Sequence, residues 1–205
     1  MRPPPPGDLR RIGRHERTLE AGTVLWRIHS TASEHPMAWN ALRTFGPLPG
    51  ARWDPHPEPA ADYDPLGAAY FGRDLLTCIA EVYQDTRFVD VNAGQPFATA
   101  IETANDAVLL DLTDVWLLRA GAKSALAGSE EKAITRAWAR AVHAAWTELD
   151  GIVAPSAVAG REVMVLWTTK QFPRAPSFSV PLSHPGIAAG LAAAAELLRF
   201  DSNVA

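Results

Sequence analysis

The chain has 205 residues, of which 47% are hydrophobic and 20% charged, and this composition is typical of one soluble globular domain. A formal net charge of −4 excludes a broad basic surface, so we expect no direct nucleic acid binding. The single cysteine, Cys78, excludes an internal disulfide, and no stretch has the length of a membrane span or the pattern of a secretory leader, so we expect a cytoplasmic protein without membrane contact.

The first segment, "MRPPPPGDLRRIGRHER", contains four consecutive prolines followed by four arginines. A polyproline run cannot join a core sheet or the interior of a helix. We therefore predict that residues 1–20 are a flexible arm rich in Pro and Arg, and that residues 21–205 form one domain.

The next segment, "TVLWRIH" over residues 23–29, alternates in the way that a strand does. Residues 30–65 follow, rich in proline and without an apolar period, which predicts an ordered loop in place of regular elements. A loop of this length inside a compact domain is usually functional or disordered. The embedded Trp39, Trp53 and Tyr63 favour the ordered, functional interpretation.

The remaining elements are read from periodicity and from end signals. We predict strands at residues 67–72, 97–102, 107–112, 151–156 and 162–169, a helix over residues 73–85 with Asp74 as N-cap, a helix from a Ser129 cap to Leu149, and a closing helix that begins at Pro185. Because strands and helices do not alternate regularly, the pattern predicts a single α+β domain.

Several well-known motifs are absent. The segment "GAKSAL" resembles the end of a P-loop, but Ala122 separates Gly121 from Lys123, and Trp116 stands where the earlier glycine is needed. The six histidines have no metal-ligand spacing, so we expect no metal site.

The helix "RDLLTCIAEVYQD" contains one glutamate, Glu81, in a mostly apolar run. At about 100° per residue, one apolar face collects Leu75, Cys78, Ile79, Val82 and Tyr83, and Glu81 falls opposite, beside Thr77, Gln84 and Asp85. A solvated helix face and the wall of a cleft both carry polar groups. Periodicity leaves both interpretations of Glu81 open.

Four segments in order, "LWRIHS", "GARWDP", "AAYFGRDLLTCIAEV" and "DGIVAPS", resemble the RES domain family, named for its characteristic arginine, glutamate and serine. The resemblance extends from about Thr23 to Trp167. Two details depart from the family pattern: "YFG" stands where alanine is often last, and "APS" stands where an aromatic residue often precedes Pro-Ser.

The resemblance implies a fold related to ADP-ribosyltransferases, with mixed β-sheets and flanking helices, and chemistry on NAD⁺. RES proteins are commonly toxins that deplete NAD⁺ by hydrolysis or phosphorolysis, and an antitoxin with an Xre-type DNA-binding domain typically restrains them. NAD⁺ would be the substrate, and no cofactor is implied. At the matching positions the resemblance implies catalytic roles for Glu81 and Arg27, and substrate binding by Arg52, Tyr70, Ser156 and Trp53.

These residue types suit the implied chemistry. Cleavage of the nicotinamide–ribose bond develops positive charge at C1′, which a carboxylate such as Glu81 can stabilise. Guanidinium groups bind pyrophosphate, aromatic rings stack on nicotinamide or adenine, and a serine hydroxyl can donate to phosphate or ribose. Structural explanations exist as well: Arg27 can face solvent, Arg52 can pair with Asp54 or Glu58, and Ser156 can serve a turn.

Two other functions stay open. A mono-ADP-ribosyltransferase would use the same pocket and hand the ribose to a protein target, and a catalytically inactive RES-like module would only bind a partner. The alanine-rich last helix or the basic N-terminal segment could dock an antitoxin, and the same helix could support a homo-oligomer.

Overall fold

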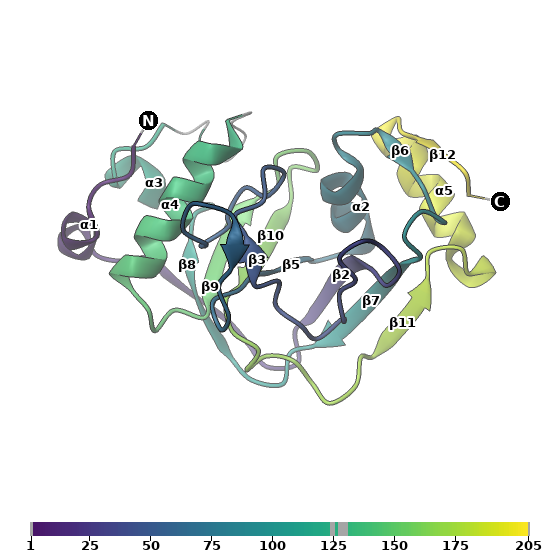
Figure 1. Cartoon of the computed structure of the whole chain (residues 1–205), viewed down its shortest axis with the longest axis horizontal. Coiled ribbons are helices and arrows are strands. Elements are labelled where there is room, and N and C mark those ends of the chain that lie inside the picture. Colours follow the sequence, from purple (N-terminus) through teal and green to yellow (C-terminus); the bar gives the residue numbers. More distant parts are fainter. Residues whose placement is uncertain (1, 124–125, 127–130, 205) are drawn as a thin grey trace.

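An eight-stranded mixed sheet runs through the computed structural model, which describes residues 2–123, 126 and 131–204 (Figure 1). In spatial order its strands are β1 (Glu16–Leu19), β8 (Ala107–Asp111), β9 (Gly151–Pro155), β10 (Glu162–Leu166), β5 (Ala69–Gly72), β2 (Val24–Ser30), β7 (Pro96–Glu102) and β11 (Phe178–Pro181). Neighbouring strands are antiparallel except β8 and β9, which run parallel. Two small sheets pair β3 (Phe45–Gly46) with β4 (Ala61–Asp62) and β6 (Phe88–Val89) with β12 (Asp201–Ser202).

Two groups of helices pack against the two ends of the sheet (Figure 1). The first group is α1 (Pro6–Ile12), α3 (Trp116–Arg119) and α4 (Lys132–Ala145), and the second is α2 (Leu75–Tyr83) and α5 (Pro185–Leu198). Trp116, Trp138 and Ile152 belong to the core beneath the first group, whereas Ile79 and Leu191 belong to the core beneath the second. The central strands β10, β5 and β2 therefore lie between two packed ends.

The structure confirms the predicted α+β fold and most of its regular elements. Asp74 caps α2, since its Oδ1 accepts from the Thr77 backbone N–H at 2.8 Å, and α5 begins at Pro185 as predicted. The predicted Ser129 cap lies outside the described residues. The helix α4 ends at Ala145 instead of Leu149, because the chain must turn through residues 146–150 to enter β9 beside β8.

Parts of the segment over residues 1–20, predicted as a flexible arm, pack against the domain in the structure. Leu9 of α1 is fully buried in the core, and the Arg10 Nε donates to the Ala145 carbonyl at 2.8 Å. Residues Glu16–Leu19 form β1, which extends the sheet beside β8. The proline run does not prevent this packing, because a helix tolerates proline in its first turn and α1 begins at Pro6.

Residues 30–65 form an ordered loop with only two short strands, β3 and β4, as their composition predicts. A bridge between Arg43 and Ala68 ties this loop to the chain just before β5. Among the described residues, no helix combines the length and the apolar character that a membrane crossing needs.

Candidate active site

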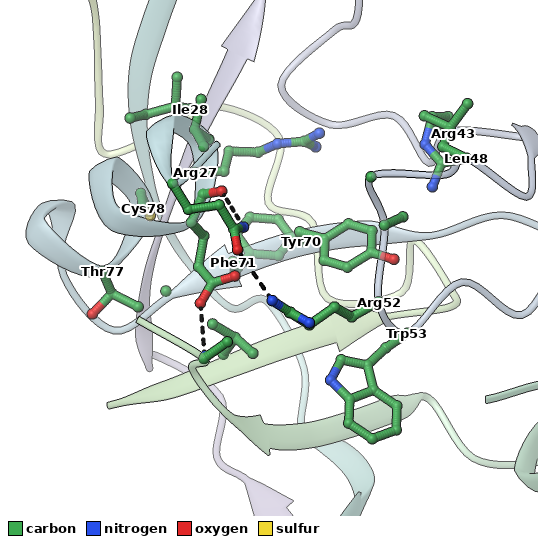
Figure 2. Close-up of a pocket in the computed structure, with 18 of the residues that line it drawn as sticks. Arg27, Ile28, Arg43, Leu48, Arg52, Trp53, Tyr70, Phe71, Thr77 and Cys78 are labelled. Atoms are coloured by element: carbon green, nitrogen blue, oxygen red, sulfur yellow. Dashed lines mark hydrogen bonds between the residues drawn. The ribbon is translucent and has the colours of Figure 1, made fainter. Parts of the chain in front are cut away.

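A cavity of about 410 Å³ opens beside α2, next to the central strands β2 and β5 (Figure 2). Its walls come from β2, β5 and α2, from Val163 of β10, and from Pro155 and Ala157 at the end of β9. The long loop adds Arg43, Leu48 and residues 50–53. Five of the six predicted site residues line the cavity: Arg27, Arg52, Trp53, Tyr70 and Glu81. The sixth, Ser156, lies between two lining residues.

Glu81 is half-buried at the edge of the cavity, and the end of β9 holds its carboxylate. Its Oε1 accepts from the Ser156 hydroxyl at 2.5 Å and from the Ala157 backbone N–H at 3.2 Å. The Ser156 oxygen in turn accepts from the backbone N–H groups of Val158 and Ala159. No described residue donates to Oε2, so this oxygen is available to a ligand.

The buried face of α2 differs from the face that periodicity predicted, as if the helix were rotated about its axis. Thr77, expected on the polar side, is fully buried, whereas Val82, expected in the core, is 49% exposed and lines the cavity. The hydroxyl of Thr77 donates to the capping carboxylate of Asp74, which satisfies it inside the protein. This rotation puts Glu81 at the boundary between core and solvent, where it faces the cavity.

Arg27 is a buried cation in the floor of the cavity. Its side chain extends over the Phe71 ring, with the guanidinium carbon 5.3 Å from the ring centroid. Its Nη1 donates to the carbonyls of Trp39 and Ala41 at 2.9 and 3.1 Å, whereas its buried Nε has no hydrogen-bond partner among the described residues. Burial lowers the pKa of Arg27 to about 10, so the group is still charged at neutral pH.

Arg52 reaches the cavity from the loop, and α2 holds it through Gln84. The Arg52 Nη2 donates to Gln84 Oε1 at 3.2 Å, and Gln84 Nε2 donates to the Glu81 carbonyl at 2.7 Å (Figure 2). The sequence-based pairing of Arg52 with Asp54 or Glu58 was wrong, because those carboxylates face Arg43 and Arg140. Sequence reasoning did not assign Gln84 to the site, although it lies three residues after Glu81, about one helical turn away.

The two aromatic candidates differ in their exposure to the cavity. The Tyr70 hydroxyl points toward the loop that carries Arg52 (Figure 2). Burial raises the pKa of Tyr70 well above its usual value, so the hydroxyl stays protonated. Trp53 also lines the cavity, but only 2% of it is exposed, and it packs in the hydrophobic core. Tyr70 is therefore the better surface for a stacked ring.

Cys78 also lines the cavity, but its buried thiol stays protonated at neutral pH. Its thiol donates to the Trp26 carbonyl, with Sγ and O 3.0 Å apart, and burial raises its pKa to about 12. In the described part of the chain, no group of three or more His, Cys, Asp or Glu side chains is placed to hold a metal.

The cavity thus combines one carboxylate, cationic side chains and an aromatic surface. A carboxylate with one available oxygen can stabilise a developing positive charge, and guanidinium groups favour phosphate. The arrangement suits a ligand that has an anionic part and a part that becomes positive during reaction.

Comparisons with known proteins identify a family and a fold for this chain. A family model described as the RES domain matches residues 24–186, a range that includes all six predicted site residues. A chain of the crystal structure of the M. tuberculosis MbcT–MbcA toxin–antitoxin complex superposes with a TM-score of 0.55 over 85% of this chain and 90% of that chain. At 19% sequence identity, this likeness establishes the fold. No curated protein matches the sequence significantly.

Proposed function

This chain belongs to the RES domain family, and we propose that it is a toxin that cleaves the nicotinamide–ribose bond of NAD⁺. The observation that carries the proposal is the position of Glu81 and Arg27 on one cavity of about 410 Å³. Depletion of NAD⁺ would be its effect in the cell, with water or phosphate as the acceptor.

The proposed reaction breaks the bond between C1′ of the ribose and the nicotinamide nitrogen. The bonding electron pair leaves with nicotinamide, which departs as a neutral base and needs no general acid. The positive charge that develops at C1′ and the ring oxygen is stabilised by the Glu81 carboxylate. Ser156 and Ala157 fix one carboxylate oxygen, which leaves Oε2 for the ribose. Water or phosphate then adds to C1′.

The remaining site groups are assigned to binding. Arg27 is buried and its Nε has no hydrogen-bond partner among the described residues, so an anionic group of the ligand is its natural acceptor. Arg52 approaches from the opposite wall and shares the pyrophosphate in this proposal. The Tyr70 ring provides a stacking surface for nicotinamide or adenine.

An antitoxin completes the proposal as a partner. The superposed structure is described as a toxin–antitoxin complex, and this supports a partner that restrains the activity of the present chain. In the proposal, an antitoxin with an Xre-type domain blocks access to the cavity.

The experiment that tests the proposal mixes the purified protein with NAD⁺, with and without phosphate, and follows the products by proton NMR. Nicotinamide with ADP-ribose identifies a hydrolase, and a phosphorylated ADP-ribose that forms only with phosphate identifies a phosphorylase. The matched control is Glu81→Gln, which keeps the length of the side chain and removes the charge, and turnover should fall about 100-fold or more. Intact NAD⁺ in every tube contradicts the proposal, and labelled ADP-ribose on protein would favour a mono-ADP-ribosyltransferase.

A further inference from the structure

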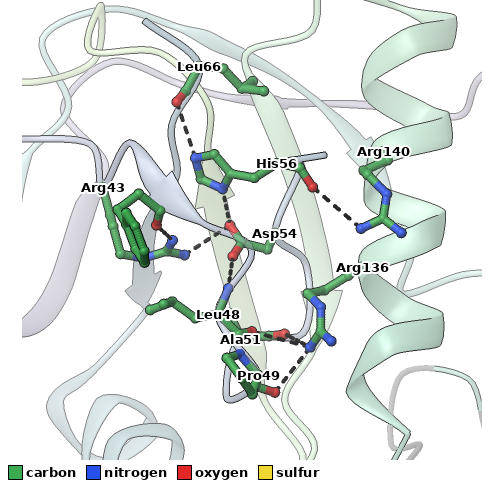
Figure 3. Close-up of polar contacts among 10 residues, drawn as sticks. Arg43, Leu48, Pro49, Ala51, Asp54, His56, Leu66, Arg136 and Arg140 are labelled. Carbon is green, nitrogen blue, oxygen red and sulfur yellow. Dashed lines mark hydrogen bonds and ion pairs between the residues drawn. The ribbon is translucent and has the colours of Figure 1, made fainter. Parts of the chain in front are cut away.

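A buried ionic cluster centred on Asp54 adjoins the loop that carries Arg52 (Figure 3), and one of its members, Arg43, also lines the cavity. Asp54 is fully buried, and its carboxylate accepts from Arg43 Nη2 at 2.9 Å, His56 Nδ1 at 2.6 Å and the Leu48 backbone N–H at 2.9 Å. Burial raises the pKa of Asp54, but the hydrogen bond from His56 and the charge of Arg43 outweigh it, so the pKa lies below its usual value. Asp54 is therefore an ionised group that needs all of its donors.

The cluster ties the loop to the sheet. His56 is also fully buried, and its Nε2 lies 3.2 Å from the Leu66 carbonyl. The backbone of Arg43 pairs with Ala68, immediately before β5. Through these contacts, Asp54 connects the two ends of residues 48–56 to the entrance of β5.

A second clamp holds the same loop from α4 (Figure 3). The Arg136 Nη1 donates to the carbonyls of Leu48, Pro49 and Ala51 at 3.1 to 3.2 Å. The loop is thus closed on one side by the buried cluster and on the other by an arginine of α4. Between the two clamps, Arg52 and Trp53 face the cavity.

The carboxylate wall of the site is held independently of this loop. Ser156 and Ala157 at the end of β9 position the Glu81 carboxylate. Arg52 of the loop donates to the Gln84 side chain at the end of α2. A substitution in the Asp54 cluster should therefore displace Arg52 and Trp53 more than it displaces the Glu81 carboxylate.

We propose that Asp54 and His56 are positioning residues that hold Arg52 and Trp53 in the orientation that binds the anionic part of the ligand. The inference rests on the proposed function, in which Arg52 contacts the pyrophosphate. It adds that ligand affinity depends on a buried carboxylate and a buried imidazole that lie outside the described cavity lining.

The test compares His56→Leu, which removes both ring contacts, with His56→Asn, whose amide N–H can replace Nδ1–H toward Asp54. We expect His56→Leu to raise both KM for NAD⁺ and Kd for ADP-ribose about tenfold and to change kcat by less than about threefold, because a charge-assisted contact is lost on the binding wall alone. His56→Asn should restore most of the affinity. A merely structural role would reduce the amount of folded enzyme, and so lower kcat with KM unchanged.

Asp111→Asn is the matched control, because Asp111 also pairs with an arginine inside a hydrogen-bonded cluster. Its Oδ2 lies 2.7 Å from Arg17 Nη2, and its Oδ1 accepts from Thr113, but it lies outside the cavity lining that the structure describes. This variant should lower the melting temperature and leave KM for NAD⁺ and Kd for ADP-ribose unchanged.

Hydrogen exchange without ligand separates this inference from the proposed function. The Leu48 amide, which donates to Asp54, should exchange faster in His56→Leu than in the wild type and in Asp111→Asn. If the wild type binds ADP-ribose without cleaving NAD⁺, the proposed function is wrong, and weaker ADP-ribose binding by His56→Leu still supports the positioning role. Unchanged Leu48 exchange, or unchanged affinity in His56→Leu, overturns the inference.

Discussion

Replacement of Arg27 by methionine should separate ligand affinity from stability. Burial lowers the pKa of this arginine from 12.5 to about 10, which corresponds to roughly 3 kcal/mol of unfavourable burial of the charged form. A cation with a lowered pKa in the folded state destabilises that state at every pH below about 10. The destabilisation is relieved only as the pH rises from about 10 toward 12.5.

The substitution Arg27→Met removes this charge and keeps an unbranched side chain over the Phe71 ring. It also removes the hydrogen bonds to the Trp39 and Ala41 carbonyls, at a cost of about 1 kcal/mol each. The two effects nearly cancel, so the free energy of unfolding should stay within about 1 kcal/mol of the wild type. The affinity for ADP-ribose should fall about 10- to 100-fold, because a charge-assisted hydrogen bond to phosphate is lost.

Urea unfolding gives the stability, and calorimetric titration with ADP-ribose gives the affinity. Arg174→Met is a matched control, because Arg174 is exposed and lies outside the described cavity lining. A variant at Arg27 that lost more than about 3 kcal/mol and bound ADP-ribose normally would refute the argument. Arg27 would then have a structural role, in which its hydrogen bonds hold residues 39–41 in place.

Three further predictions concern other parts of the molecule. Ser156→Ala should lower kcat for NAD⁺ about 10- to 100-fold, because the Glu81 carboxylate loses its hydroxyl donor and keeps only the Ala157 N–H. Ser156→Thr keeps a hydroxyl and should retain activity. Equal kcat values for the wild type and both variants would contradict the role assigned to Ser156. Cys78, with a pKa of about 12, should resist iodoacetamide at pH 8 in the folded protein and react in urea, and rapid labelling of the folded protein would contradict its burial. Leu9→Ala should reduce the free energy of unfolding by about 2–5 kcal/mol in a denaturant titration, and a change below about 0.5 kcal/mol would mean that α1 does not pack as described.

The elements that sequence analysis predicted are those with a strong local signal. β2 alternates cleanly, and α2 and α5 have a cap or a proline at their start. β1 and β11 were not predicted, because one follows a proline run and the other lies in a short polar and proline-rich segment. Both are edge strands, whose pairing with β8 and β7 depends on partners far along the chain.

The site shows the same limit. Periodicity identified Glu81 as the polar residue of α2, but the choice between solvent and cavity depends on Ser156, which is 75 positions away. The family resemblance, and not the local pattern, selected the residues that the structure brings to one cavity. The contact of Asp54 with Arg43 was missed, because sequence analysis weighed only Arg52, two residues away, as a partner for Asp54.

The order of strands in the sheet also sets when the site is assembled during translation. Arg27, Arg52 and Glu81 all belong to the first half of the chain, yet Ser156 reaches Glu81 only because β10 pairs with both β9 and β5. A nascent chain that has not delivered residues 162–166 therefore has every charged group of the site, but the strand that positions Ser156 beside the Glu81 carboxylate is absent. A product that ends before residue 162 would therefore carry Arg27, Arg52 and Glu81 without the assembled site.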